Sequence, residues 1–206
     1  MFYVLEGIDG SGKSTQARLL AEHLARRGGR RVVQVREPGG TPLGERLREI
    51  LLDPGSGDLA PEVEVLLFMA ARAHLCVQLI RPALEEGATV VADRFVWSSV
   101  VYQGIVGGLG REQILKLGRL ATRDLDPTHT FLIDLDPAIA DGRISSRDRM
   151  ESRGVDYQRE LRQGYLSLAE GLPEQFSVVV GDGSKDDVHA RLLAALESVM
   201  GQGRGE

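Results

Sequence analysis

Short apolar stretches rich in Val and Ile alternate along the chain with longer segments in which apolar residues recur every three or four positions. The short stretches predict β-strands, and their near-continuous apolar character is typical of strands buried on both faces. The longer segments predict amphipathic helices. The predicted strands are 2–5, 31–35, 89–92, 130–135 and 176–180. The predicted helices are 13–27, 43–52, 62–86, 98–106, 111–123, 156–170 and 185–200.

This alternation predicts an α/β fold with a five-stranded parallel sheet and helices on both faces. A length of 206 residues suits one domain with a sizeable core, so we expect residues 1–206 to form a single domain. One segment, about 141–156, is dense in charge and poor in apolar residues, and we interpret it as a flap.

Composition narrows the functional classes. The net charge of −5 lacks the basic excess that indicates a nucleic-acid or anionic-membrane partner. One cysteine excludes an internal disulfide framework and a cysteine-built zinc site. No stretch has the pattern of a signal peptide or a bilayer-spanning segment, so we expect a cytoplasmic protein without membrane or nucleic-acid partners.

The stretch that follows the first predicted strand matches G-x-x-x-x-G-K-[ST], and a predicted helix follows it, as this motif requires. Glycines let successive N–H groups point inward, and the helix N-terminus adds partial positive charge, which together bind phosphate. Lys13 would bridge β- and γ-phosphates, and the Ser14 hydroxyl would complete a Mg²⁺ shell. The alternative is a glycine-rich turn with an exposed lysine. The expected nucleotide-binding residues here are Gly7, Ile8, Asp9, Gly10, Ser11, Gly12, Lys13, Ser14 and Thr15.

A second acidic position ends the predicted strand 89–92. Asp93 there would lie at the carboxyl edge of the sheet, where a carboxylate can order Mg²⁺ or its waters. Arg94 follows and would point to the same edge, where a second anion can bind. The alternative for this pair is a salt bridge at the strand end.

These features leave a GTPase switch, an ATPase motor or transporter subunit, and a small-molecule kinase. The chain contains no asparagine, so the Asn-Lys-x-Asp guanine-reading element is missing, which argues against the first class. Motors normally need longer chains with further signature motifs. A small kinase needs an acceptor pocket and a flap that excludes water.

The ordered motifs beyond the phosphate loop resemble those of the thymidylate kinase family, in its bacterial form, over essentially the whole chain. They are REPGGT at 36–41, LLFMAAR at 66–72, DRF at 93–95, SSVVYQG at 98–104 and DRME at 148–151. The resemblance implies a P-loop kinase sandwich of three layers with a short flap, a homodimer, and Mg²⁺-dependent phosphoryl transfer from ATP to dTMP. The alternatives are a kinase for another deoxynucleoside monophosphate or a nucleoside, and a nucleotide-binding regulatory module.

The nucleobase end of the acceptor pocket involves two pairs spaced four apart on helices. In the family, the positions of Phe68 and Arg72 stack on thymine and hydrogen-bond its O4. The alternative is a core phenylalanine with a solvated arginine one turn on. Ser99 and Gln103 form the second pair, and the glutamine amide can serve both N3–H and a carbonyl. By analogy, Tyr102 would crowd a ribose 2′-hydroxyl and favour deoxyribose.

The phosphate end of the pocket needs positive donors. Arg94 and Arg48 match family positions at the phosphate of dTMP, and Glu37 and Asp9 match acidic positions near the transferred phosphate or the deoxyribose. Asp9 can also hold a water of Mg²⁺. An anionic phosphate oxygen is already nucleophilic, so we expect positioning and charge neutralisation, rather than a general base, to carry the catalysis.

The flap is expected to supply positive charge at the transition state. Some family members have an arginine inside the phosphate loop, where this chain has Gly10. In the family, the members that lack this loop arginine use flap arginines to clamp the ATP phosphates. Arg149 is the first choice, followed by Arg143 and Arg147. The alternative is a solvated charged loop. The expected catalytic residues are Lys13, Arg94, Arg149 and Asp9.

Overall fold

The computed structural model describes residues 1–144 and 148–202. Its sheet has five parallel strands in the order β2-β3-β1-β4-β5. All five predicted strands are confirmed to within one residue at either end. The strands are β1 (Phe2–Glu6), β2 (Val32–Arg36), β3 (Thr89–Asp93), β4 (His129–Asp134) and β5 (Phe176–Val180).

The helices follow the predicted segments, with three differences. The predicted helix 98–106 begins at Val96 and is π-helical over Val100–Val106. The predicted helix 62–86 is continuous but includes a π-helical turn, and the unpredicted α7 follows β4. The α-helices are α1 (Lys13–Arg26), α2 (Pro42–Leu52), α3 (Pro61–Leu75), α4 (Arg81–Glu85), α5 (Val96–Ser99), α6 (Arg111–Thr122), α7 (Pro137–Asp141), α8 (Gly154–Gly171) and α9 (Lys185–Gln202). The π-helical segments are η2 (Cys76–Ile80) and η3 (Val100–Val106), and the 3₁₀ turns are η1 (Pro54–Ser56) and η4 (Glu151–Arg153).

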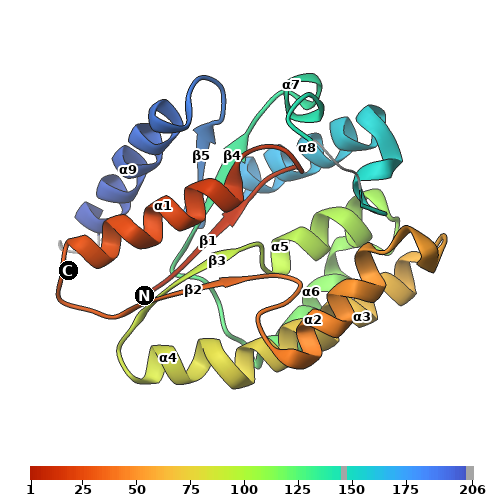
Figure 1. The fold of residues 1–206 in the computed structure, drawn as a ribbon, viewed down its shortest axis with the longest axis horizontal. Helices are drawn as coiled ribbons and strands as arrows, with labels where there is room; N and C mark the ends of the chain where they lie inside the picture. Colours follow the sequence, from red (N-terminus) through yellow and green to blue (C-terminus); the bar gives the residue numbers. More distant parts are fainter. Residues whose placement is uncertain (145–147, 203–206) are drawn as a thin grey trace.

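Helices cover both faces of the sheet (Figure 1). Tyr3 and Leu5 of β1 pack into a core with residues of α1 and α9, whereas Phe2 and Val4 pack with residues of the α3–η2–α4 segment. The side chains of a strand point alternately to opposite faces, so one apolar strand supplies two cores. A third apolar cluster joins α3, η3, α6 and α8 beside β4 and β5.

The carboxyl ends of all five strands lie at one edge of the sheet because the strands are parallel. The loop from β1 to α1, the end of β2, and the loop after β3 therefore meet there. In open α/β sheets this edge is where ligands bind. The fold thus brings together motifs that are far apart in the sequence.

By length and composition alone, the helical stretch Pro61–Glu85 could cross a membrane. In the structure 44% of its most apolar window is buried inside the fold, and a core helix passes the same test. Its apolar excess is therefore accounted for in part by packing against β3, η3 and α6.

Candidate functional site

The phosphate loop curls before α1 as its glycines allow. Gly10 and Gly12 have φ of 76° and 93°, in the left-handed region that side chains disfavour. The Lys13 ammonium is buried and donates to the Ile8 carbonyl at 2.9 Å, with Asp9 Oδ1 at 3.4 Å. The loop backbone thereby holds the lysine side chain against its own turn.

The unpredicted helix α7 explains the glycine at position 10. A Cβ atom on Gly10 would lie 2.3 Å from the carbonyl oxygen of Ala140 in α7. Van der Waals contact forbids that distance, so this packing leaves no room for a side chain inside the loop. The sequence shows the glycine but not the helix that requires it.

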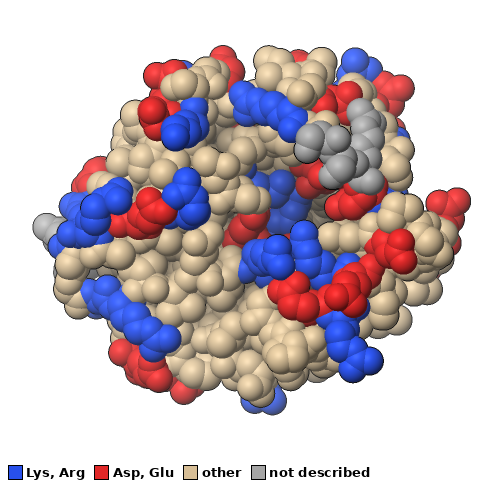
Figure 2. All heavy atoms as spheres, viewed as in Figure 1, with Lys and Arg blue, Asp and Glu red and all other residues tan. Residues whose placement is uncertain are grey.

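Two cavities meet at the phosphate loop. The acceptor cavity, of about 340 Å³, includes in its lining Asp9, Gly10, Lys13, Ser14, Glu37, Arg48, Phe68, Asp93, Arg94, Ser99, Tyr102 and Gln103. The loop cavity, of about 510 Å³, is lined by Gly10, Ser11, Gly12, Lys13, Ser14, Thr15 and Arg143 together with Gly183, Lys185 and neighbours. Figure 2 shows a hollow in the middle of one face, with basic and acidic side chains around it. Most of the expected site residues therefore surround one connected region.

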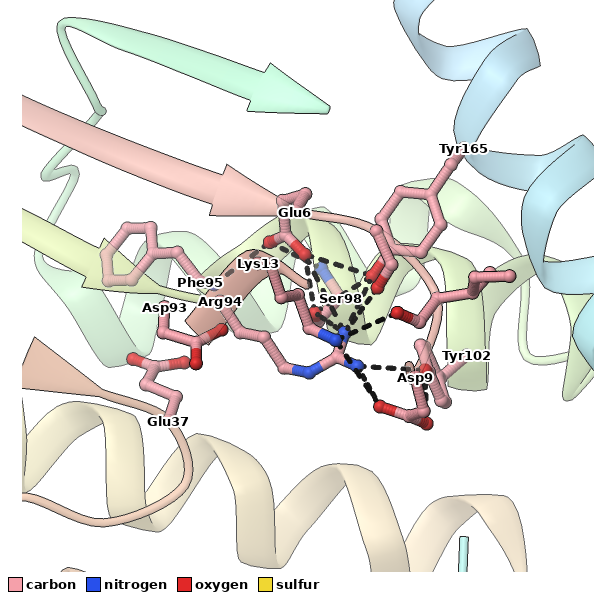
Figure 3. A network of polar contacts seen from close by, with 12 residues as sticks. Glu6, Asp9, Lys13, Glu37, Asp93, Arg94, Phe95, Ser98, Tyr102 and Tyr165 are labelled. Carbon is pink, nitrogen blue, oxygen red and sulfur yellow. Dashed lines mark hydrogen bonds and ion pairs between the residues drawn. The ribbon is translucent and has the colours of Figure 1, made fainter. Parts of the chain in front are cut away.

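Arg94 is the centre of a polar network at this edge (Figure 3). Its Nη1 donates to the Gly7 carbonyl and to the hydroxyls of Ser98 and Tyr165, and its Nη2 donates to Asp9 and to the Tyr102 hydroxyl. Its φ of 72° is rare for a residue with a side chain and costs about 1–3 kcal/mol, which these partners offset.

Asp9 is the charge partner of Arg94. Tyr102 also donates to Asp9, at 3.0 Å. Burial opposes ionisation of Asp9, but the charges of Arg94 and Lys13 hold its pKa well below the ordinary value. Asp9 is therefore a carboxylate across the physiological pH range, which fits positioning rather than proton transfer. The Asp93–Arg94 salt bridge considered from the sequence is not formed, because Arg94 points toward Asp9 instead.

Glu6 is a site residue that the sequence reasoning missed. It is fully buried at the end of β1 and accepts hydrogen bonds from the backbone N–H groups of Phe95 and Ser98 and from the hydroxyls of Ser98 and Tyr165. Burial raises its pKa, which Arg94 opposes. The sequence feature that could have identified Glu6 is its position as a charged residue directly after the apolar run of the first predicted strand.

Glu37 and Arg72 form a buried ion pair. Arg72 Nε donates to Glu37 Oε2 at 2.7 Å, and its Nη groups donate to Ser99 Oγ, the Phe95 carbonyl and Met69 Sδ. These bonds use four of the five guanidinium N–H donors, and Nη2 also lies 2.7 Å from Glu37 Oε2. Arg72 is 1% exposed, so the solvated alternative is wrong. It also lies behind the acceptor cavity rather than in its lining, so its contact with thymine O4 stays a prediction that requires an exchange of partners.

Glu37 should make stability depend on pH. Burial raises the pKa of its carboxyl to about 7, against the charge of Arg72. Because the folded state then binds more protons than the unfolded state between about pH 4.5 and 7, Glu37 lowers the free energy of unfolding as pH rises through this window. We expect Glu37→Gln to flatten that decline, measured by urea denaturation at pH 5, 6, 7 and 8. Parallel curves for the two proteins would contradict the assignment.

The acceptor cavity includes in its lining Phe68, Ser99, Tyr102 and Gln103, which are expected to lie near the nucleobase or the sugar. Gln103 is 1% exposed, and its Nε2 donates to Glu64 at 3.0 Å. Its Oε1 has no partner among the described residues. A buried acceptor without a partner costs about 1–3 kcal/mol, so this oxygen is suited to a ligand N–H.

The flap residues separate in the structure. Arg143 reaches the loop cavity, whereas Arg149 is buried, donating to Glu64 Oε1 at 2.6 Å and to the Leu51 carbonyl at 2.8 Å. The solvated alternative is therefore wrong for Arg149, but its guanidinium is directed to α3 rather than to either cavity because Glu64 attracts it. Its contact with a phosphate stays a prediction. Arg147 lies outside the described residues.

Ser14 and Asp93 fit the expected magnesium site. The Ser14 hydroxyl contacts Asp93 Oδ2, and Asp93 Oδ1 is buried without a partner among the residues that the structure describes. Within these residues no cluster of three or more His, Cys, Asp or Glu forms a metal cage. Magnesium bound mainly by phosphates and water needs only this small oxygen set.

Comparisons with known proteins identify the family of this chain. The thymidylate kinase family model matches residues 5–192. A thymidylate kinase of Symbiobacterium thermophilum is 43% identical over 97% of this chain and 94% of its own length, and one of Bifidobacterium longum strain DJO10A is 44% identical over 97% and 98%. The crystal structure of a thymidylate kinase from Ehrlichia chaffeensis has a TM-score of 0.80 at 33% identity and covers 95% of this chain and 98% of that one. These similarities in sequence and fold show that the chain belongs to the thymidylate kinase family.

Proposed function

We propose that this enzyme, in phosphorylating dTMP to dTDP, uses ATP as donor and Mg²⁺ as cofactor, with direct phosphoryl transfer between the two cavities. The observation that carries the proposal is that the two cavities have lining residues in common. Gly10, Lys13 and Ser14 line both, so a donor on the phosphate loop and an acceptor in the other cavity would meet at the lysine. Such an arrangement favours catalysis by positioning and charge neutralisation.

The acceptor roles follow from the lining. Phe68 would stack on the thymine ring, and Gln103 Oε1 would accept its N3–H. Arg94 and Arg48 would bind the phosphate, and Tyr102 would lie beside the sugar. Asp9 positions Arg94 and Tyr102 through its two carboxylate oxygens.

The donor roles use the loop backbone. Its N–H groups would bind the β-phosphate, Lys13 would bridge to the γ-phosphate, and Arg143 would add charge from the flap. Ser14 and Asp93 would hold Mg²⁺ or its waters. When bound, the ion would supply positive charge that neutralises the phosphate groups.

A panel of monophosphates tests the proposal, with ATP and Mg²⁺ present and ADP release measured. We expect dTMP to be the best substrate. Loss of one methyl group is worth about 1 kcal/mol, so dUMP should be several-fold poorer. Cytosine reverses the donor and acceptor that face Gln103, so dCMP should be at least about a hundredfold poorer.

Equal rates with dTMP and dCMP would contradict the nucleobase assignment. ATP binding without turnover on any monophosphate would favour the regulatory alternative. Omission of Mg²⁺, with excess chelator, should abolish turnover, and full activity under that condition would exclude the metal role.

We also propose a cytoplasmic homodimer. The outer faces of α3 and α6 expose apolar side chains, among them Leu66 at 59% and Leu120 at 79%. Such side chains on neighbouring helices suit a contact between copies.

A further inference from the structure

Glu64 lies on α3, one helical turn before Phe68, and is 1% exposed. It lines neither of the two cavities at the phosphate loop. Its Oε1 accepts from the guanidiniums of Arg149 and Arg153, and its Oε2 accepts from Gln103 Nε2 at 3.0 Å. One buried carboxylate therefore joins the residue expected to read the nucleobase to two arginines of the flap.

We propose that Glu64 is a positioning residue that sets nucleobase specificity by orienting the Gln103 carboxamide with its oxygen toward the acceptor cavity. This inference rests on the proposed function, which places Gln103 against the nucleobase. Under this proposal Glu64, which does not touch the substrate, decides whether the site accepts a base with a ring N–H donor or one with a ring acceptor.

The argument starts from the symmetry of a carboxamide. A half-turn of the terminal amide exchanges a donor for an acceptor with almost no change in shape. Gln103 alone could therefore present either group to a base. A carboxylate between two guanidiniums can only accept hydrogen bonds, so it selects the orientation with nitrogen toward Glu64. The oxygen is then the amide atom left for a ligand, because Gln103 lines the acceptor cavity and this oxygen has no partner among the described residues.

The two arginines hold the Glu64 carboxylate in place. Arg149 is itself anchored by the Leu51 carbonyl at 2.8 Å, and Arg153 bonds the Tyr157 hydroxyl at 2.8 Å. A buried carboxylate is tolerated only with such charged partners. The orientation of Gln103 is therefore fixed before any ligand binds.

A fixed oxygen discriminates between bases by the group at ring position 3. Thymine presents an N–H there and is bound, whereas cytosine presents a lone pair that would face the Gln103 oxygen. With Glu64 in place, the amide cannot turn to relieve this repulsion without directing its oxygen at a carboxylate. Rejection is strong because both orientations are unfavourable for cytosine.

The test compares kcat/KM for dTMP and dCMP in the wild type and in Glu64→Gln. A glutamine at 64 can present either oxygen or nitrogen, so the Gln103 amide becomes free to turn. We expect the dTMP/dCMP ratio to fall at least about tenfold, with an absolute rise in kcat/KM for dCMP. The matched control is Arg153→Met, which removes one ion pair from the same carboxylate but leaves its acceptor oxygens, and which should keep the ratio.

An unchanged ratio in Glu64→Gln, or an equal fall for both substrates, would overturn the inference. Gln103→Leu separates this result from failure of the proposed function. If Gln103→Leu keeps full discrimination, the nucleobase assignment itself is wrong. If it loses discrimination while Glu64→Gln keeps it, only the role of Glu64 is wrong.

A second variant covers the case in which circular dichroism shows that Glu64→Gln does not fold. Glu64→Asp keeps a carboxylate that the long side chains of Arg149 and Arg153 can still reach. Because aspartate is one methylene shorter, its carboxylate lies farther from Gln103 Nε2. We expect a smaller fall in the dTMP/dCMP ratio, of about threefold or more. An unchanged ratio in folded Glu64→Asp would equally contradict the inference.

Discussion

Replacing Lys13 by alanine should lower kcat by about two to three orders of magnitude while leaving the protein folded. The ammonium is placed where both cavities meet, so its charge would act on the phosphoryl group as it moves from donor to acceptor. Charge aimed at a group in transfer is worth most at the transition state. Steady-state kinetics with saturating ATP and dTMP measures the loss.

The fold should survive because Lys13 is not an essential structural partner. Burial and the nearby charge of Arg94 lower its pKa, which shows that the folded protein disfavours the ammonium in the absence of a ligand. Asp9 keeps Arg94 as its partner when the lysine is removed. Lys116→Ala, on the exposed side of α6, is the matched control and should be as active as the wild type. Near-normal turnover in folded Lys13→Ala would overturn its role.

Replacing Arg94 by methionine should have the largest combined effect on stability and activity. The buried guanidinium lies beside Asp9 and 4.0 Å from Glu6, so its loss leaves two carboxyl groups without their main compensating charge. Breaking a buried pair in this way costs about 3–5 kcal/mol. We also expect kcat/KM for dTMP to fall about a hundredfold or more, because the acceptor phosphate loses a charged donor. Urea denaturation and steady-state kinetics measure the two effects.

A double variant separates the ion pair from general disruption of the site. Asp9→Asn removes the charge that Arg94 neutralises. The loss in free energy of unfolding in the double variant Arg94→Met/Asp9→Asn should therefore be smaller, by about 1 kcal/mol or more, than the sum of the losses in the two single variants. Arg94→Lys should recover part of the stability, because it keeps the charge, but little of the activity, because it loses the planar fork. Additive effects in the cycle would exclude the proposed coupling.

The strands and the phosphate loop could be predicted because their causes are local. Apolar runs of four to six residues form buried strands, and glycine spacing before Lys13 and Ser14 specifies a turn that binds phosphate. The position of Asp93 at the carboxyl edge of the sheet could be predicted because Asp93 directly follows a strand that was expected to be parallel to its neighbours. The helix α7 was missed because it is only Pro137–Asp141, too short for a periodic pattern to be evident.

The partners of the buried arginines could not be predicted in this way. Arg72 and Arg149 were assigned to ligands by their place in motifs, yet the structure gives them carboxylates 35 and 85 residues away along the chain. Whether a guanidinium faces a cavity or a buried carboxylate depends on how α3, the end of β2 and the flap pack together. Motif spacing carries no information about that packing.

The amino-acid sequence by itself determined the α/β layers, the phosphate loop and the family, because each depends on residue types at short, regular spacing. Only the tertiary structure decided which charges meet. It joined Glu6, Asp9, Arg94 and Tyr165 from three separate parts of the chain, and it placed Glu64 beside Gln103. The physical reason is that burial makes an unpaired charge or donor costly, so these buried charged groups pair with the partners that the fold brings near.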